Sequence, residues 1–247
     1  MIYEWKPSSE YRNYGDALGE IVADALREGL MSERDILDNP EIMYFPIGSV
    51  VGDYYMEPII EMGLTPVFIG CGWYGEEITP KFAQMSQYIG CRGPGTKAAL
   101  ERAGVSGIPV YGDTAYIAFD YLKLSPERTE KTVFMPHILS QDGYNFENTG
   151  ADTLLIPEVK TKEDTIGMID EIASAQFVLS SAMHGCITAH AYGVPFAVYS
   201  AGGDQFPDKP KKWNDWFSSV GIDPSHVKVC STVDEGREWY EDTAPNT

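Results

Sequence analysis

His184 occupies the position in this sequence that most directly suggests chemistry. The stretch QFVLSSAMHGCITAHAYGVPFAVYS (176–200) has the pattern of a buried strand, a short loop, a helix, a turn and a second strand. His184 therefore falls in the first turn of the expected helix, where N–H groups lack helical partners and the positive end of the dipole lies. Met183 and Gly185 flank it, and the stretch predicts an anion cradle. His190, further along, is expected on another face with a structural role.

A second candidate is Arg92, in CRGPGTKAALERAG (91–104), which joins an expected strand to an expected helix. Pro94 suits the first helical turn. At the strand's carboxyl end, Arg92 is expected to point into a cleft, where a guanidinium matches a carboxylate or phosphate with two parallel hydrogen bonds. The alternative is a surface salt bridge. The segment lacks the spacing of a Walker A loop, which excludes an ordinary ATPase.

The segment RNYGDALGE (12–20) offers a further set of polar groups at a helix start. Asn13, Gly15 and Asp16 precede or begin the expected helix, so backbone donors and a close approach to a ligand are expected there. Asp16 could orient a hydroxyl or transfer a proton. The alternative is a helix N-cap and a turn, which the same residue types favour.

Three other candidates follow expected strands. Gly112 and Asp113, in IPVYGDTAYIAF (108–119), most simply form a turn with an Asx-type hydrogen bond, and a substrate contact by Asp113 is the alternative. His137, in FMPHILSQDGYN, is expected at a carboxyl edge, with a functional and a structural role equally open. His226 is expected at the surface. The segment 202–221 is either a lid or a helix that packs its aromatic residues on the core.

Short apolar runs alternate with helical patterns along the chain, which indicates an α/β fold with parallel sheets covered on both faces. The expected strands are 43–47, 66–70, 88–92, 132–136, 153–157, 176–180, 196–200 and 227–231, and the expected helices are 15–30, 93–104, 162–175, 184–193 and 233–243. Thr161 and Asp164 have the spacing of a capping box. In such sheets, ligands bind at the carboxyl ends of strands.

The polar segment 121–131 is interpreted as a linker between two Rossmann-like domains that face a cleft. The boundaries predicted are 1–122 and 123–247, with the last helix packing back on the first domain. The net charge of −19 argues against nucleic acid and anionic membrane surfaces as partners. No run is long and apolar enough for a bilayer span, and no signal peptide is expected. The four separated cysteines favour free thiols in a reducing cytoplasm over zinc or disulfides.

Taken together, these segments resemble the polysaccharide pyruvyl transferase family. The matching motifs, in order, are NYGDAL (13–18), RGPGT (92–96), GDTA (112–115), and SSAMHG followed by GVP. The resemblance extends over roughly residues 11 to 218 and implies a fold like that of B-type (GT-B) glycosyltransferases. It also implies transfer of a pyruvyl group from phosphoenolpyruvate to two sugar hydroxyls, forming a ketal on an exopolysaccharide or a lipid-linked oligosaccharide.

The resemblance carries residue roles as well. Phosphoenolpyruvate would be held by Arg92 and His184. Ketal formation also needs a general acid and a general base, for which Asp16 and His137 are candidates without an assignment of either role. Many relatives have an arginine two residues before the histidine, where this chain has Ala182. No metal and no cofactor beyond the donor substrate are expected, and the oligomeric state is left open.

Two alternatives remain. A glycosyltransferase of the same fold would use a nucleotide sugar, with Glu158 as a candidate ribose ligand. A non-catalytic relative would bind glycan without turnover.

Overall fold

The computed structural model describes residues 1–3, 10–29, 39–139, 144–201 and 209–243. The chain divides into two compact units, each described here by itself. The first unit comprises Met1–Trp5, Leu18–Tyr121 and Lys211–Pro224. The second comprises Lys6–Ala17, Leu122–Pro210 and Ser225–Thr247.

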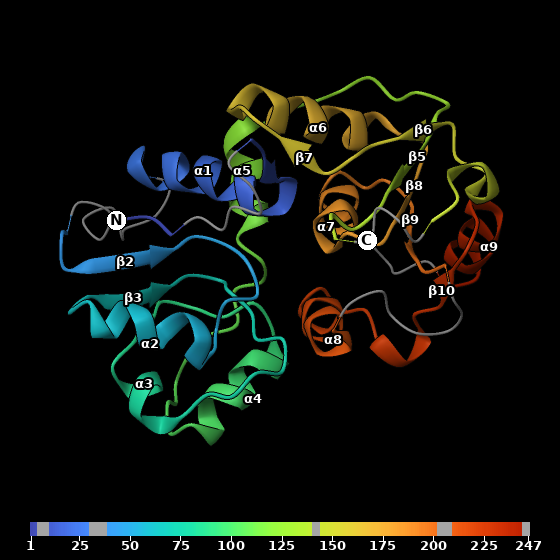
Figure 1. Ribbon diagram of the computed structural model, residues 1–247. Helices are drawn as coiled ribbons and strands as arrows, with labels where there is room; N and C mark the ends of the chain where they lie inside the picture. The colour runs from blue at the N-terminus through green and yellow to red at the C-terminus, as the bar shows by residue number, and fades with distance from the viewer. Residues whose placement is uncertain (4–9, 30–38, 140–143, 202–208, 244–247) are drawn as a thin grey trace. The chain divides into compact units, whose positions relative to one another are not determined.

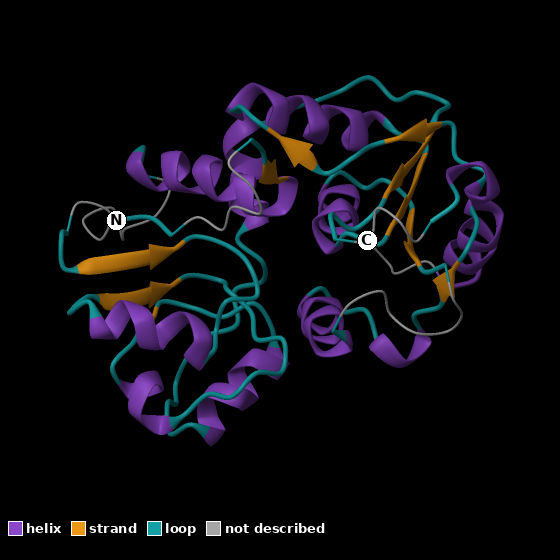
Figure 2. Cartoon of the chain, in the orientation of Figure 1, coloured by secondary structure: helices purple, strands orange, loops and turns teal. Residues whose placement is uncertain are grey.

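Helices and strands alternate along the chain (Figures 1 and 2). The helices are α1 (Tyr14–Arg27), α2 (Asp53–Glu61), α3 (Pro80–Gln84), α4 (Pro94–Arg102), α5 (Ala115–Leu122), α6 (Lys162–Ser174), α7 (Met183–Ala191), α8 (Pro210–Ser219) and α9 (Val233–Thr243), with 3-10 turns at Phe146–Thr149 and Pro224–His226. The strands are β1 (Arg12–Asn13), β2 (Ile42–Phe45), β3 (Thr65–Phe68), β4 (Gln87–Tyr88), β5 (Thr132–Met135), β6 (Thr153–Leu154), β7 (Glu158–Val159), β8 (Phe177–Ser180), β9 (Phe196–Tyr199) and β10 (Val229–Cys230).

The expected α/β class with parallel sheets is confirmed, and each expected strand and helix overlaps an observed one. Helices α2, α3 and α5 were not predicted from the sequence. Helix α2 contains a proline and α3 has 5 residues, while the sequence of α5, AYIAFDYL, is too uniformly apolar to show a helical period. Short or uniformly apolar helices lack the periodic signal on which such predictions depend.

The second unit is built on a parallel sheet with the strand order β10-β9-β8-β5-β6. Helix α7 packs on β8 and β9 with α6 beside it, and α9 covers the other face (Figure 1). Strands β5, β8 and β9 are therefore buried along their whole length and read as continuous apolar runs. The strand order reverses between β5 and β8, which is the flavodoxin-like arrangement. Ligands in such sheets bind outside the carboxyl ends at this switch point.

The first unit has a smaller parallel sheet with the order β2-β3-β4. Single bridges extend it at both sides, from Ile2 to Tyr44 and from Cys91 to Val110. Phe45 and Phe68 stack at 4.7 Å and point into a core that α2, α3 and α4 complete. Among the described strands of this sheet, spatial order follows chain order, so no switch point occurs.

The domain boundaries differ from the expected ones in detail. The chain passes from the first unit to the second after Tyr121, but the start of α1 belongs to the second unit and α8 to the first. Helix α9 packs on β8, β9 and β10 within the second unit. The expected linker is partly docked, since Arg128 donates to the carbonyl oxygens of Ala173 and Tyr192.

Local signals in the second unit are read correctly. Thr161 and Asp164 form the expected capping box at the start of α6.

Helices in the described part of the chain fall short of the length and apolar character that a bilayer span requires.

Candidate functional site

The candidate site lies at the carboxyl ends of β5 and β8, at the switch point of the second unit. The loops that follow the two strands are joined there. The backbone N–H of His137 donates to Ser181 Oγ at 2.7 Å, and the N–H of Ser181 donates to the carbonyl of Met135 at 3.0 Å. Ser180 Oγ donates to the same carbonyl or to that of Ala182, each at 2.9 Å. The chain thus leaves both strands in one fixed geometry.

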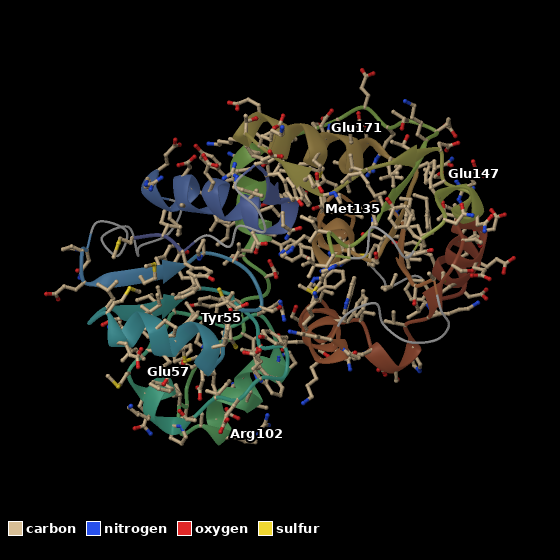
Figure 3. All side chains as sticks on the ribbon, in the orientation of Figure 1. Tyr55, Glu57, Arg102, Met135, Glu147 and Glu171 are labelled. Carbon is tan, nitrogen blue, oxygen red and sulfur yellow. The ribbon has the colours of Figure 1, made fainter. Side chains whose placement is uncertain are left out.

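Helix α7 begins directly on these strand ends, and Gly185 allows the close approach. A Cβ at this position would lie 2.6 Å from Ser180 Oγ and 2.9 Å from Sδ of Met135, which Figure 3 labels. The N-cap residue, Ala182, has no side-chain group that could cap the helix. The first turn of α7 therefore lacks a side-chain cap, while the N–H of Gly185 donates to the carbonyl of Ala182 at 3.0 Å.

The start of α1 is anchored beside α7 through backbone pairing. Asn13 in β1 pairs with Glu158 in β7, and the N–H of Tyr14 donates to the carbonyl of Pro157 at 2.9 Å. Glu158, the candidate ribose ligand, thus lies opposite Asn13 in this pairing, and its own N–H donates to the carbonyl of Ile156 at 2.8 Å.

A side-chain relay ties the two helix starts together. Thr188 Oγ1 donates to the carbonyl of His184 at 2.7 Å, so the hydroxyl of Tyr14, 2.7 Å from Thr188 Oγ1, is the donor in that contact. Burial raises the pKa of Tyr14 well above its ordinary range, so the hydroxyl keeps its proton. The relay fixes the first turn of α7, and with it the position of His184.

Gly15 places the α1 backbone against the imidazole of His184. A Cβ at position 15 would overlap Nδ1 of that ring, so only glycine fits here. Two residues away, Asn13 Nδ2 donates to Asp16 Oδ2 at 2.7 Å, which holds the carboxylate at the same helix start. The structure therefore brings the NYGD and HG motifs, widely separated in the sequence, into one site.

The other three histidines differ in burial and in their contacts. His137 is half-buried, and its Nδ1 accepts a 3.3 Å hydrogen bond from the N–H of Leu139. This assigns the remaining proton of a neutral ring to Nε2. His190 packs edge-on against Phe196, and burial lowers its pKa, which fits the expected structural role. His226 is exposed, as expected. Met183 is buried in the first turn of α7.

Arg92 corrects the sequence reading. Its side chain is 0% exposed, so it neither points into an open cleft nor forms a surface salt bridge. Its Nε lies 3.2 Å from Asp215 Oδ2, and its Nη1 donates to Ser49 Oγ at 2.8 Å and lies 3.8 Å from Asp113 Oδ2. Asp215, in α8, is the partner that sequence reasoning missed, since nothing local in WNDWF marks it as the arginine's counter-ion.

The RGPGT segment is nevertheless a carboxylate cradle, and its occupant is Asp215. Thr96 donates to that carboxylate twice, from its N–H at 2.8 Å and from its Oγ1 at 2.6 Å. A Cβ at Gly93 would overlap the backbone oxygen of Asp215, and one at Gly95 would lie 3.1 Å from its Oδ1. The chemistry expected of the motif is present, but the carboxylate comes from the protein itself.

The GDTA segment has the simpler of its two expected roles. Asp113 Oδ1 accepts from the N–H of Ala115 at 3.0 Å, which is the expected Asx-type bond at the start of α5. Gly112 precedes it with φ of +89°, a conformation that favours glycine. Asp113 is 3% exposed, so a substrate contact by its side chain is not seen.

The segment 202–221, for which a lid and a core-packing helix were the alternatives, packs on the core where it is described. Residues 202–208 lie outside the described part of the chain. In α8, Trp213, Trp216 and Phe217 are completely buried, which confirms the packing alternative. Within the described residues, acidic, histidine and cysteine side chains form no group suited to a metal ion.

The predicted site residues thus fall into two groups. Asn13, Gly15, Asp16, His137, Met183, His184 and Gly185 lie in the second unit, and Arg92, Gly112 and Asp113 lie in the first. The first group combines a helix start without a side-chain cap, two imidazoles and a carboxylate in the second unit, which suits an anionic substrate and proton transfer.

A sequence profile of polysaccharide pyruvyl transferases matches residues 13–202, which include every residue of both groups. The chain belongs to the polysaccharide pyruvyl transferase family. One relative is the succinoglycan biosynthesis protein ExoV of Rhizobium meliloti. It is 25% identical over 237 residues, which are 94% of this chain and 69% of that protein. An uncharacterized protein of Acanthamoeba polyphaga mimivirus is 28% identical over 82 residues, 33% of this chain and 28% of its own.

The fold also has a solved counterpart. A functionally uncharacterized protein from Klebsiella pneumoniae superposes with a TM-score of 0.55 at 13% identity, covering 87% of this chain and 86% of its own. At that identity, the likeness concerns the fold alone.

Proposed function

We propose that this protein transfers the pyruvyl group of phosphoenolpyruvate to two hydroxyls of a sugar, forming a ketal on a surface polysaccharide or its precursor. Membership of the family supports the reaction class. The relative named for succinoglycan biosynthesis supports a role in exopolysaccharide assembly. Phosphoenolpyruvate acts as donor substrate, without a further cofactor.

The observation that carries the proposal is the placement of His184. It stands in the first turn of α7 at the switch point, with the glycine of the NYGD segment against its ring. Phosphoenolpyruvate is a small trianion, and it would place its phosphate at this helix start, where the helix dipole and the imidazole favour negative charge. Asn13 and Asp16 border the same position.

The proton balance of the reaction assigns work to the remaining groups. Two C–O bonds form at the central carbon, while its double bond is consumed and its bond to the phosphate oxygen breaks. Of the two hydroxyl protons, one reaches the methylene carbon, which becomes a methyl group, and the other leaves with phosphate. Asp16 is suited to accept a hydroxyl proton and His137 to donate one from Nε2.

Two cationic contacts that relatives would use are altered here. Ala182 stands where many relatives carry arginine, and Arg92 is occupied by Asp215. Donor binding therefore depends on the two helix starts and His184. The arrangement of two Rossmann-like domains about a cleft stays a prediction, as does the cytoplasmic location, which four buried free thiols favour.

Thermal unfolding in the presence of phosphoenolpyruvate tests the donor site. A ligand that binds only the folded state adds about 2.7 kcal/mol at a hundredfold excess over Kd. We expect a rise in Tm with phosphoenolpyruvate that His184→Ala abolishes and His226→Ala, at an exposed histidine, leaves intact. A shift with a UDP-sugar and none with phosphoenolpyruvate would establish a glycosyltransferase instead. A shift with neither would leave a glycan-binding relative without turnover.

A further inference from the structure

A cavity of about 370 Å³ opens on the first unit, beside the start of α4. Its volume lies within the range of small-molecule sites, roughly 300–1,000 Å³. The loop after β3, helix α4 and helix α8 contribute its walls. The lining residues are Trp73, Gly95, Ala98, Arg102, Lys211, Asn214, Asp215 and Ser218. None of them belongs to the candidate site of the second unit.

The indole of Trp73 forms a fixed platform in this cavity. Its Nε1 donates to the carbonyl of Glu76 at 2.6 Å, and its backbone N–H donates to Thr96 Oγ1 at 2.8 Å. Thr96 is held in turn by Asp215. The half-buried ring is therefore positioned before any ligand arrives, which reduces the ordering cost of binding.

The exposed charges of the cavity are positive, in a chain of net charge −19. The Lys211 ammonium lies 4.7 Å and the Arg102 guanidinium 5.7 Å from the Trp73 ring. Figure 3 shows Arg102 at the end of α4. Asp215, the acidic member of this lining, is 2% exposed and paired with Arg92. An anionic group would thus meet two available cations.

Neutral polar groups complete the lining. Asn214 and Ser218 are exposed and, with Lys211, recur at helical spacing on one face of α8. An amide and a hydroxyl side by side suit the hydroxyls of a sugar.

We propose that this cavity binds an acidic sugar, with its carboxylate at Lys211 and Arg102, the two cations that lie over the Trp73 ring. The inference rests on the proposed function, because it assigns the chemical class of the acceptor glycan. It adds a subsite to that function, on the first unit, that contacts the acceptor and takes no part in donor binding.

Indole N–H resonances report on binding at this cavity. The ¹⁵N-labelled protein is titrated with cellobiouronic acid and, in parallel, with cellobiose, which lacks only the carboxylate. The Trp73 resonance is assigned by its loss in Trp73→Phe. We expect the resonance to shift with both sugars, but the affinity for cellobiose should be at least about tenfold lower than that for the acid. A charge-assisted contact contributes that factor or more to the affinity.

Charge-removing variants locate the contact. Lys211→Met and Arg102→Gln should each lower the affinity for cellobiouronic acid by about tenfold. Lys81→Met is the matched control, since Lys81 lies 4.8 Å over the Phe82 ring in the same unit but outside the cavity; it should bind as the wild type does.

Several results would overturn the proposal. Equal affinities for acid and cellobiose would remove the role of the charge, and no movement of the Trp73 resonance would remove the site. Inorganic phosphate binding as tightly as the acid would reduce the cavity to a general anion site. Absence of a thermal shift with phosphoenolpyruvate, with acid binding retained, would contradict the proposed function and leave this site standing.

Discussion

At the scale of single residues, one glycine explains the geometry of the candidate site. Gly15 has its backbone against the imidazole of His184, and a Cβ there would overlap Nδ1. Asx-type and glycine signals near a helix start have local explanations, so the sequence left the role of NYGD open. The contact gives the glycine a second function, because it sets the distance between the two helix starts.

Replacement of Gly15 by alanine tests this contact. Alanine ordinarily favours a helix over glycine by about 0.5–1 kcal/mol, but at position 15 its methyl group must displace the imidazole. We expect phosphoenolpyruvate turnover to fall at least about a hundredfold, because misplacement by about 1 Å costs that much. Gly167→Ala in α6, where a Cβ meets no atom within 4 Å, is the control and should be active and slightly more stable. Wild-type turnover in Gly15→Ala would contradict the assignment.

At the scale of elements, an ion pair between residues far apart in the sequence joins α8 to the start of α4. Arg92 and Thr96 hold the Asp215 carboxylate at the start of α4, and Gly93 gives it room. Three tightly packed aromatic residues of α8 are buried around this contact. The buried pair therefore specifies where a segment from the end of the chain joins the first unit.

Removal of Asp215 should expose the cost of weakening a buried ion pair. Asp215→Ala leaves the Arg92 guanidinium with only the more distant Asp113 carboxylate, 3.8 Å from Nη1, and we expect a loss of about 3 kcal/mol in the free energy of unfolding, measured with urea. Asn214→Ala, at the exposed neighbouring position, should change stability by less than about 0.5 kcal/mol.

A double variant separates the ion pair from mere packing. Arg92→Met with Asp215→Ala removes both members of the pair and leaves Asp113 without the guanidinium, so its loss of stability should be smaller than the sum of the two single losses. If the two single losses simply add in the double variant, the charges do not stabilise one another and this interpretation of RGPGT is wrong.

At the scale of the whole molecule, the four cysteines report on the integrity of both units. Cys71 and Cys91 lie in the first unit, Cys186 and Cys230 in the second, and all are buried free thiols. Burial raises the pKa of Cys91 and of Cys230 to about 11, and that of the other two further. Thiolate is the reactive form of cysteine. Burial therefore protects the four thiols twice, because it blocks access of reagents and disfavours ionisation.

Titration with Ellman's reagent checks this expectation. The native protein should react far more slowly than free cysteine at pH 8, and all four thiols should react once urea unfolds the chain. A single thiol that reacts rapidly in the native protein would show that its unit opens readily or that the thiol is exposed.

The sequence by itself determined what depends on short stretches of chain. Continuous apolar strands between helices indicated parallel sheets covered on both faces, because strands buried on both sides need apolar residues at every position. The capping box at Thr161 and the place of His184 in the first turn of α7 followed from spacings of a few residues. Such signals act within one or two helical turns, so they are legible without the fold.

Only the tertiary structure decided which groups meet. Arg92 pairs with a carboxylate 123 residues away, and Tyr14 contacts Thr188 across 174 residues. A guanidinium at a helix start binds a carboxylate of the protein or of a substrate by the same hydrogen bonds, so its residue type leaves the partner open. Packing settles the matter, because it buried Arg92 against Asp215 and placed Gly15 against the imidazole of His184.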